Sequence, residues 1–435
     1  MAQINVVSGI GVFVPIWIGQ TVSLLGSGLT GFALGIWVYQ QTGSVTQFAL
    51  ISFFTALPGV LISPLAGTLV DRWDRRKAML LSDLGAGLST SAIALLLFAN
   101  RLSMWHIYLA MAIVSTFSAF QWLAYTAATT VLVPKKHLGR ASGMVQLAEA
   151  TAQILSPALA GLLVVKIQIQ GVILIDVSTF IFSVVTLLLV RFPKLETTLQ
   201  EEKVGKGLLR REVTYGWTYI TTRSGLLGLL MFLAVNNFVT GVVSVLVTPL
   251  VLSFASITVL GTVQSVAGSG MLIGSLLMSV WGGSSRRVYS LLSFTLLGGL
   301  CIIITGLRPS VPVFFVAGFL YFFGLPIING SSQAIWQSKV APLVQGRVFA
   351  VRRMIAWSSL PLAYLVAGPL ADRVFQPLLV VDGPLAGNIG RIIGVGPGYG
   401  IALLFVVMGM LMVLTSIGGY LYPRLRLVEE ELPDA

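Results

Sequence analysis

Long apolar runs recur along the whole chain and leave it few ways to fold. Twelve stretches are long enough to cross a bilayer, which takes about 20 residues in a helix. They span approximately residues 11–39, 46–70, 78–100, 104–132, 141–165, 169–192, 226–252, 257–281, 287–307, 311–338, 347–374 and 397–422. Only 10% of the 435 residues are charged, whereas soluble domains are about 25% charged. Lipid must therefore surround most of this protein.

The basic residues are distributed unevenly between the connections, and this predicts the orientation of the chain. With the N-terminus in the cytoplasm, 22 of the 27 Lys and Arg residues face inward. The five that face outward are Arg101, Lys166, Arg308, Arg373 and Arg391. We expect both termini to be cytoplasmic, in a multi-pass protein of the inner cell membrane without a cleaved signal peptide. The asymmetry also accounts for the net charge of +12 without a nucleic-acid partner.

Three landmarks occur twice in the same order, about 207 to 212 residues apart. The pairs are Arg75-Arg76 with Arg286-Arg287, Val133–Arg140 with Ala341–Arg347, and Ser156-Pro157 with Gly368-Pro369. Parallel repeats of this kind are typical of secondary transporters, whose site lies at the interface between the halves. We therefore predict an all-α membrane protein with 12 transmembrane helices in two pseudo-symmetric six-helix bundles.

The predicted bundles are residues 1–192 and 226–422, followed by a cytoplasmic tail at 423–435. Residues 193–225 form a polar cytoplasmic linker between them. Apolar residues recur on one helical face within this linker, at Leu209, Val213, Trp217 and Ile220. This pattern predicts an amphipathic helix on the inner membrane surface; the alternative is a disordered linker with chance periodicity.

Charge is concentrated in one short connection, after the second apolar run. The stretch "GTLVDRWDRR" resembles the loop 2–3 signature G-x-L-x-D-R-x-G-R-R of the major facilitator superfamily. Gly67, Leu69, Asp71, Arg72, Arg75 and Arg76 carry the match, and Asp74 replaces the second glycine of the pattern. Aspartate tolerates tight-turn backbone, so we interpret Asp74 as a variation of the motif.

Further stretches narrow the resemblance to the drug:proton antiporter branch. Ser156, Pro157 and Gly161 are similar to the antiporter motif G-P-x-x-x-G of helix 5, with serine for the first glycine. "ILIDVSTFIFSVVTLLL", "QGRVFAVRRM" and "VAGPLADRVF" resemble the branch that contains macrolide-efflux proteins and the enterobactin exporter. Helix 4 has Gln121 but lacks the intramembrane arginine of a sister branch. A coupling scheme based on that arginine therefore does not transfer.

The resemblance also assigns a role to Asp71. It implies that Asp71 caps the end of helix 2 and faces the start of helix 11, near Gly346–Arg353, when the cytoplasmic side is closed. A carboxylate is favoured at a helix N-terminus by the partial positive charge there. Asp71 is thus expected to be a latch within a cluster of bases that otherwise serves orientation.

Three acidic residues lie well inside predicted helices: Asp83, Glu149 and Asp176. Ionisable groups inside a bilayer are costly and are candidates for function. Glu149 shares a helical face with Gln146 and Gln153 and is our leading proton-coupling candidate; the alternative is a neutral, hydrogen-bonded side chain. Asp83 is expected to pair with bases at the start of helix 3, and Asp176 is mainly a marker of the family. Both stay open as proton sites.

Uncharged polar residues on the inner helices are candidate substrate contacts. They are Gln20, Ser23, Gln121, Gln146, Asn236, Asn237, Gln264, Asn329 and Gln333. With aromatic residues such as Trp122, Phe322 and Trp336, they describe a mostly apolar pocket with few polar anchors. The alternative is that they join helices to one another. Small residues four apart, as at Gly270 and Gly274 or at Ser27 and Gly31, predict close helix packing within one subunit.

Several function classes are excluded by what the sequence lacks. It has no P-loop, no dinucleotide fingerprint, no Ser/His/Asp set and no metal-ligand cluster, and Cys301 is its single cysteine. We therefore expect no cofactor, no metal and no enzyme activity. Without an ATP-binding module, transport energy must come from a gradient.

The sequence therefore predicts a secondary active transporter. We expect a monomer in the lipid bilayer that exports a small amphipathic organic compound, such as a drug, a macrolide or a siderophore, in exchange for protons. Transport of a lysophospholipid or similar molecule by the same fold is the main alternative. A non-transporting sensor or membrane enzyme is disfavoured, because no polar constellation or sizeable cytoplasmic domain is present.

Overall fold

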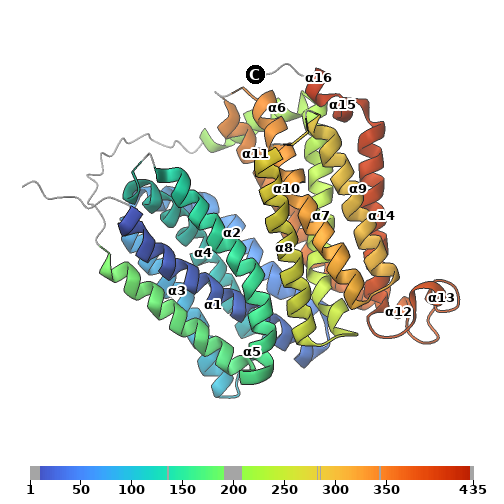
Figure 1. Cartoon of the computed structure of the whole chain (residues 1–435), viewed down its shortest axis with the longest axis horizontal. Helices are drawn as coiled ribbons and strands as arrows, with labels where there is room; N and C mark the ends of the chain where they lie inside the picture. Colours follow the sequence, from blue (N-terminus) through green and yellow to red (C-terminus); the bar gives the residue numbers. More distant parts are fainter. Residues whose placement is uncertain are drawn as a thin grey trace, which may run out of the picture. The chain divides into compact units, whose positions relative to one another are not determined.

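The computed structural model describes residues 10–134, 137–190, 208–281, 283–284, 286–341 and 344–431, and every regular element in them is a helix (Figure 1). The first five are α1 (Ile10–Thr42), α2 (Val45–Arg72), α3 (Arg75–Phe98), α4 (Met104–Leu132) and α5 (Leu138–Leu189). Next come α6 (Leu208–Thr221), α7 (Ser224–Leu252), α8 (Ile257–Trp281), α9 (Arg287–Leu307), α10 (Val311–Lys339) and α11 (Gln345–Pro369). The chain continues with the π-helical η3 (Leu370–Phe375), α12 (Gln376–Leu378), α13 (Gly390–Ile393), α14 (Tyr399–Leu421), α15 (Pro423–Arg426) and α16 (Val428–Glu431).

The helices form two compact units. Within the described residues, unit 1 draws on Met1–Gly43, Leu50–Gln200 and Leu260–Ser265. Unit 2 draws on Ser44–Ala49, Glu201–Val259 and Val266–Ala435. The first turn of α2 thus packs with unit 2 although the rest of that helix belongs to unit 1.

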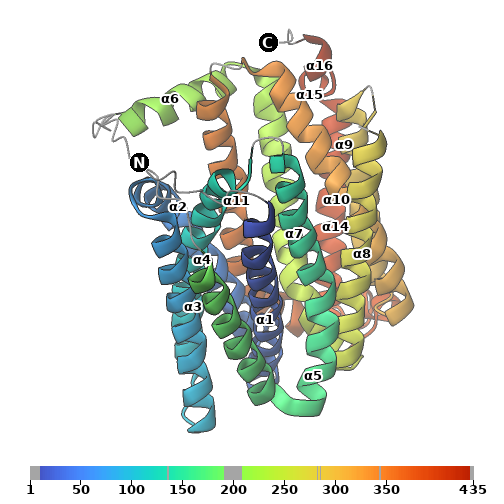
Figure 2. The ribbon, with the colours of Figure 1, turned by 60° about the vertical axis from the view of Figure 1, so that its left-hand side comes forward.

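Helix α5 has 52 residues and contains a sharp change of direction. Gln168 has φ 58° and ψ 179°, which is not helical, and the two limbs of α5 meet there (Figure 2). The limbs correspond to the predicted spans 141–165 and 169–192. Eleven helices of the described residues are long and apolar enough to cross a membrane. Because α5 has the length of two spans, this number agrees with the twelve predicted.

In unit 1, α1 packs along α5 through two glycines seven residues apart. A side chain at Gly19 would overlap Thr186, and one at Gly26 would overlap Thr179. Residues seven apart lie on the same helical face, so these glycines let the second limb of α5 approach α1 over two turns. A Cβ added at Gly31, which belongs to the small-residue spacing noted in the sequence, would have no neighbour within 4 Å. The close contact is thus on a different stripe of α1 from the expected one.

In unit 2, α8 and α10 approach at Gly270 and Gly274, as their spacing predicts. A Cβ at either position would overlap a backbone carbonyl oxygen of α10, that of Phe319 or Phe323. Only glycine lets two backbones come so close. The prediction of close packing within one subunit is correct at this pair.

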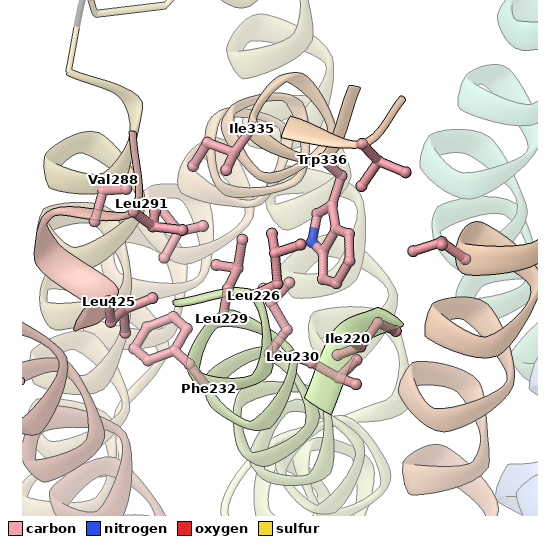
Figure 3. Close-up of a cluster of buried hydrophobic side chains, with 14 of the residues drawn as sticks. Ile220, Leu226, Leu229, Leu230, Phe232, Val288, Leu291, Ile335, Trp336 and Leu425 are labelled. Carbon is pink, nitrogen blue, oxygen red and sulfur yellow. The ribbon is translucent and has the colours of Figure 1, made fainter. Parts of the chain in front are cut away.

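A large apolar cluster lies within unit 2 (Figure 3). It contains side chains of α7, α9, α10 and α15 around the fully buried Trp336. Helix α6 joins the cluster through Ile220, while a Cβ added at Gly216 would lie 2.7 Å from the carbonyl oxygen of Arg347 on α11. Trp217, which was expected on the apolar face, is exposed. Helix α6 therefore packs through Gly216 and Ile220, and Figure 2 shows it lying across the direction of α7.

The α8–α10 contact gives a stability prediction. Gly274→Ala places a methyl group against the Phe323 carbonyl and should destabilise the fold by about 1–3 kcal/mol, as overpacking does. Gly318→Ala on α10 is the matched control, because its nearest neighbour lies at an ordinary 3.7 Å. Alanine also favours helix over glycine by about 1 kcal/mol, so the control should melt at the same temperature as the wild type or higher. Thermal unfolding of detergent-purified protein checks this, and equal melting of both variants would contradict it.

Candidate functional site

Four polar side chains from four helical segments of unit 1 form a connected set, the Asp83 network. Gln20 of α1 donates from Nε2 to Asp83 Oδ2 on α3 over 3.0 Å and to Ser183 Oγ on the second limb of α5 over 2.9 Å. Ser183 donates to Asp83 Oδ2 over 3.1 Å. Gln121 of α4 donates from Nε2 to Gln20 Oε1 over 2.8 Å. Two predicted substrate contacts, Gln20 and Gln121, are thus joined to a predicted proton site.

The Asp83 carboxylate is buried among neutral partners. Its side chain is 8% exposed, and only Gln20 and Ser183 interact with it among the described residues. The expectation that Asp83 pairs with bases at the start of helix 3 is therefore wrong. Arg76, two turns earlier in α3, instead donates to the carbonyl oxygens of Leu187 and Leu188 over 3.0 and 2.7 Å. Moving a charge from water into the protein costs several kcal/mol without a paired ion. An ionised Asp83 carboxylate is therefore costly at this position.

Asp176 is a second buried carboxylate in unit 1. It is 3% exposed and lies beside Gly26 of α1. Ser27 of the same helix donates to its Oδ1 over 3.3 Å, and Thr30 lies beside it. Its burial goes beyond the role of a family marker that the sequence suggested.

Glu149 differs from both carboxylates because its side chain is exposed. Gln146 and Gln153 are exposed on α5 as well, in keeping with the shared face. Glu149 acts electrostatically on Tyr125 of α4, whose buried hydroxyl has no hydrogen-bond partner among the described residues. This face of α5 is open to a ligand in a way that the surroundings of Asp83 and Asp176 are not.

Polar residues of α7 and α10 join helices in unit 2. Asn237 donates to the carbonyl oxygen of Ala356 on α11 over 3.2 Å. Thr240 and Tyr321 share a hydrogen bond of 2.7 Å between α7 and α10. Asn236 is 4% exposed, and its Oδ1 has no partner among the described residues. Asn237 thus makes a helix-joining contact, while Asn236 keeps a free acceptor.

Gln333 of α10 holds an arginine of α11. Arg352 donates from one guanidinium nitrogen to Gln333 Oε1 over 2.8 Å and from another to Ser332 Oγ over 3.2 Å. Its guanidinium carbon lies 5.2 Å from the centre of the Trp336 ring, in cation–π range. Of the other predicted contacts, Asn329 is exposed, whereas Ser23 and Gln264 are half-buried.

The helix 5 motif lies where α1 and the first limb of α5 meet. Ser156 is buried and donates to the carbonyl oxygen of Leu25 over 3.3 Å. A side chain at Gly28 would overlap Ser156, and one at Gly261 of α8 would overlap the carbonyl oxygen of Pro157. Gly161, the last motif residue, is buried. The motif thus serves tight packing in unit 1.

The loop 2–3 motif is described only in part. The surroundings of Gly67 and the side chains of Asp71 and Arg72 lie outside what the structure describes, so the Asp71 latch stays a prediction. Asp74 is the N-cap of α3, and its Oδ1 accepts a hydrogen bond from Lys77 N over 3.0 Å. The aspartate that replaces a motif glycine therefore starts a helix, as N-cap aspartates do.

A carboxylate that the sequence did not single out caps the first turn of α2 within unit 2. Asp372 in η3 accepts hydrogen bonds from Val45 N over 3.1 Å and from Thr46 N over 2.8 Å. The hydroxyls of Ser44 and Thr46 also donate to it, over 2.9 and 2.7 Å. Gly368 makes the approach possible, because a side chain there would overlap Thr46.

Ser183, Arg352 and Asp372 are among the residues of these contacts that sequence reasoning missed. Ser183 follows Asp176 by seven residues, so heptad spacing from a buried acid could have indicated it. Arg352 was counted only among the bases that set orientation. Asp372 lies inside "VAGPLADRVF", which was used only to recognise the family.

Comparison with known proteins supports a transport function. A family model described as Major Facilitator Superfamily matches residues 16–364. Macrolide efflux protein A of Streptococcus pyogenes is 29% identical over 366 residues, covering 83% of this chain and 90% of that protein. The multidrug efflux pump Tap of Mycolicibacterium fortuitum is 24% identical over 361 residues, covering 80% and 86%.

Solved structures agree in fold. A mutant of the nucleoside transporter NupG aligns with a TM-score of 0.72 at 9% identity, over 94% of this chain and 99% of that one. An inward-facing bacterial homologue of the human lysosomal transporter Spinster aligns with a TM-score of 0.66 at 15% identity, over 96% of each chain.

The Asp372 cap yields a local prediction. Asp372→Ala leaves the N–H groups of Val45 and Thr46 without their acceptor, which should cost about 1–3 kcal/mol. Hydrogen–deuterium exchange of the segment around residues 44–47 should then become faster. Asp372→Asn, which keeps one acceptor oxygen, should have a smaller effect, and Arg373→Ala, at the exposed next position, should have none. Unchanged exchange in Asp372→Ala would show that the cap is dispensable.

Proposed function

Because the chain belongs to the Major Facilitator Superfamily, we propose that it exports an amphipathic organic compound in exchange for protons. The compound is a drug, a macrolide or a siderophore, and transport follows alternating access between the two sides of the membrane. The transporter works as a monomer in the inner membrane with both termini in the cytoplasm.

One observation carries the proposal of proton exchange. Asp83 is a buried carboxyl group that is held by neutral hydrogen-bonding groups only, among the described residues. Ionisable residues inside membrane helices mark ion and proton pathways. Asp176 has the same character, and Glu149 offers an exposed carboxyl group on α5. Each of the three is a candidate proton site.

The substrate proposal rests on the relatives and on the polar residues. The similar proteins are named for macrolide or multidrug efflux. A macrolide combines a large apolar surface with hydroxyls and an amine, which suits an apolar pocket with few polar anchors. The proposed anchors are Gln20, Ser23, Gln121, Gln146, Asn236, Asn237, Gln264, Asn329 and Gln333. The chain has no nucleotide-binding motif, which leaves an ion gradient or the substrate's own gradient as the energy source, and the proposal takes the proton gradient.

Transport in proteoliposomes tests the proposal. Vesicles with an acidic interior should accumulate labelled erythromycin, and a protonophore should abolish the accumulation. A siderophore and a labelled lysophospholipid are run in parallel. Accumulation of the lysophospholipid alone would contradict the drug-export proposal in favour of lipid transport.

Carboxyl variants test the proton site in the same vesicles. Asp83→Asn, Glu149→Gln and Asp176→Asn are compared for gradient-driven accumulation and for gradient-independent counterflow of the same substrate. Loss of the proton site should abolish accumulation, at least tenfold, while counterflow continues, because substrate exchange needs no net proton movement. Normal accumulation in all three variants would exclude these carboxyls from coupling.

A further inference from the structure

The hydrogen bonds of the Asp83 network have a direction, and the charge on Asp83 sets it. An ionised carboxylate can only accept, so Gln20 must present its Nε2 to Asp83. Both hydrogens of that nitrogen are used, toward Asp83 Oδ2 and Ser183 Oγ. Gln20 Oε1 therefore faces Gln121, which has to donate through its own Nε2. Three successive polar groups are thus aligned by one charge.

At its far end, this series of hydrogen bonds stops at an acceptor that is not used. Gln121 Oε1 is buried and has no hydrogen-bond partner among the described residues. An unpartnered buried acceptor is unfavourable, and rotation of the whole amide cannot repair it while Asp83 is ionised. The Gln121 side chain as a whole is half-buried, so part of the same residue is exposed.

We propose that a proton on Asp83 reverses the network and thereby changes what Gln121 offers to a substrate. The protonated carboxyl donates to Gln20 Oε1 after the Gln20 amide turns over. Ser183 can donate to the same oxygen because its hydroxyl rotates. Gln20 Nε2 then donates to Gln121 Oε1, and Gln121 Nε2 takes the outer place. The outer atom of Gln121 is an acceptor without the proton and a donor with it.

Because of this reversal, binding of the proton and binding of the substrate oppose each other, as exchange requires. A substrate that donates from an ammonium group, which has no acceptor, binds the acceptor form of Gln121 and is rejected by the donor form. Substrate binding therefore releases one proton from Asp83, and proton binding releases the substrate. A single O–H bond breaks or forms, and the proton leaves to water on one side and returns from water on the other. The inference rests on the proposed proton exchange and names its site and the substrate group that it recognises.

The other carboxyl groups of unit 1 lack such a connection. Asp176 contacts Ser27 and Thr30, both on α1, and a hydroxyl can turn to donate or accept without passing the change to a further group. Glu149 is exposed and acts on Tyr125 through its charge. Among these three carboxyls, Asp83 is the one that the described contacts link through an amide to a second amide on another helix.

The charged and titratable groups to consider near the network lie on α3, α4 and α5. On α3, Arg76 is engaged with the carbonyl oxygens of Leu187 and Leu188. On α4, Tyr125 lies one turn after Gln121, and on α5, Asp176 lies two turns before Ser183. None of the three interacts with the Asp83 carboxyl itself. Among the described residues, a change of protonation at Asp83 therefore acts directly on Gln20 and Ser183.

Infrared difference spectra between high and low pH test the relay without any substrate. The full-length protein in lipid nanodiscs should show a protonated-carboxyl band that disappears in Asp83→Asn. The side-chain amide bands of glutamine should shift with the same titration, because both amides exchange partners. In Gln20→Leu the carboxyl band should remain while the coupled amide shift is lost, a pattern that a merely structural role of Gln20 does not produce.

Binding of labelled erythromycin as a function of pH tests the coupling. The affinity of the wild type for erythromycin should fall at least tenfold from high to low pH. In Gln20→Leu and in Asp83→Asn, the affinity should change less than twofold over the same pH range. Thr21→Val is the matched control, since the Thr21 hydroxyl donates to Trp17 O in its own helix; it should keep the wild-type pH dependence.

The outcomes separate the two proposals. A tenfold pH dependence that persists in Gln20→Leu overturns the relay, as do carboxyl bands that are unchanged in Asp83→Asn. A coupled carboxyl and amide titration in a wild type that binds no erythromycin supports the relay and overturns the macrolide as substrate.

Discussion

The absence of water from the bilayer interior is the constraint on which the rest of this structure depends. Every polar group that enters lipid must find its hydrogen-bond partner inside the protein. The backbone meets this demand by forming helices throughout the described residues. Polar side chains meet it by contacting one another across helices, as in the Asp83 network and the pair of Thr240 and Tyr321. Among the described residues, the buried polar atoms without partners are unusual for the same reason, and Gln121 Oε1 is one that ends a directed series of hydrogen bonds.

The same constraint explains why glycine has so large a part in the packing. Lipid tails are as apolar as leucine, so helices in a membrane associate through close contact of small residues. Gly19 and Gly26 bring α1 against α5, and Gly274 brings α8 against α10. The first of these contacts also sets the distance at which Gln20 reaches Ser183. The hydrogen bond between Gln20 and Ser183 is therefore a consequence of backbone approach on a neighbouring stripe of the same two helices.

Fold class was predictable because it depends on local composition, whereas the site depends on partners far apart in the chain. Each apolar run of sufficient length is expected to cross the membrane as a helix. The repeat of landmarks such as Ser156-Pro157 indicated two halves. The family resemblance, carried by stretches such as Gly67–Arg76, pointed to efflux. For Asp83, however, the nearest charges in sequence suggested pairing with bases, and the structure pairs it with Gln20 and Ser183, 63 and 100 residues away. Sequence proximity suggested the wrong partner because helix packing decides which faces meet.

By itself, the sequence determined that the chain is helical, spans a membrane and belongs among transporters, since hydropathy and short motifs are properties of neighbouring residues. It also identified Asp83, Gln20 and Gln121 as separate candidates. Only the tertiary structure decided that hydrogen bonds join these three residues, that Asp176 is buried, and that Asp372 caps α2. Hydrogen bonds act over about 3 Å, and only folding brings helices hundreds of residues apart to that distance.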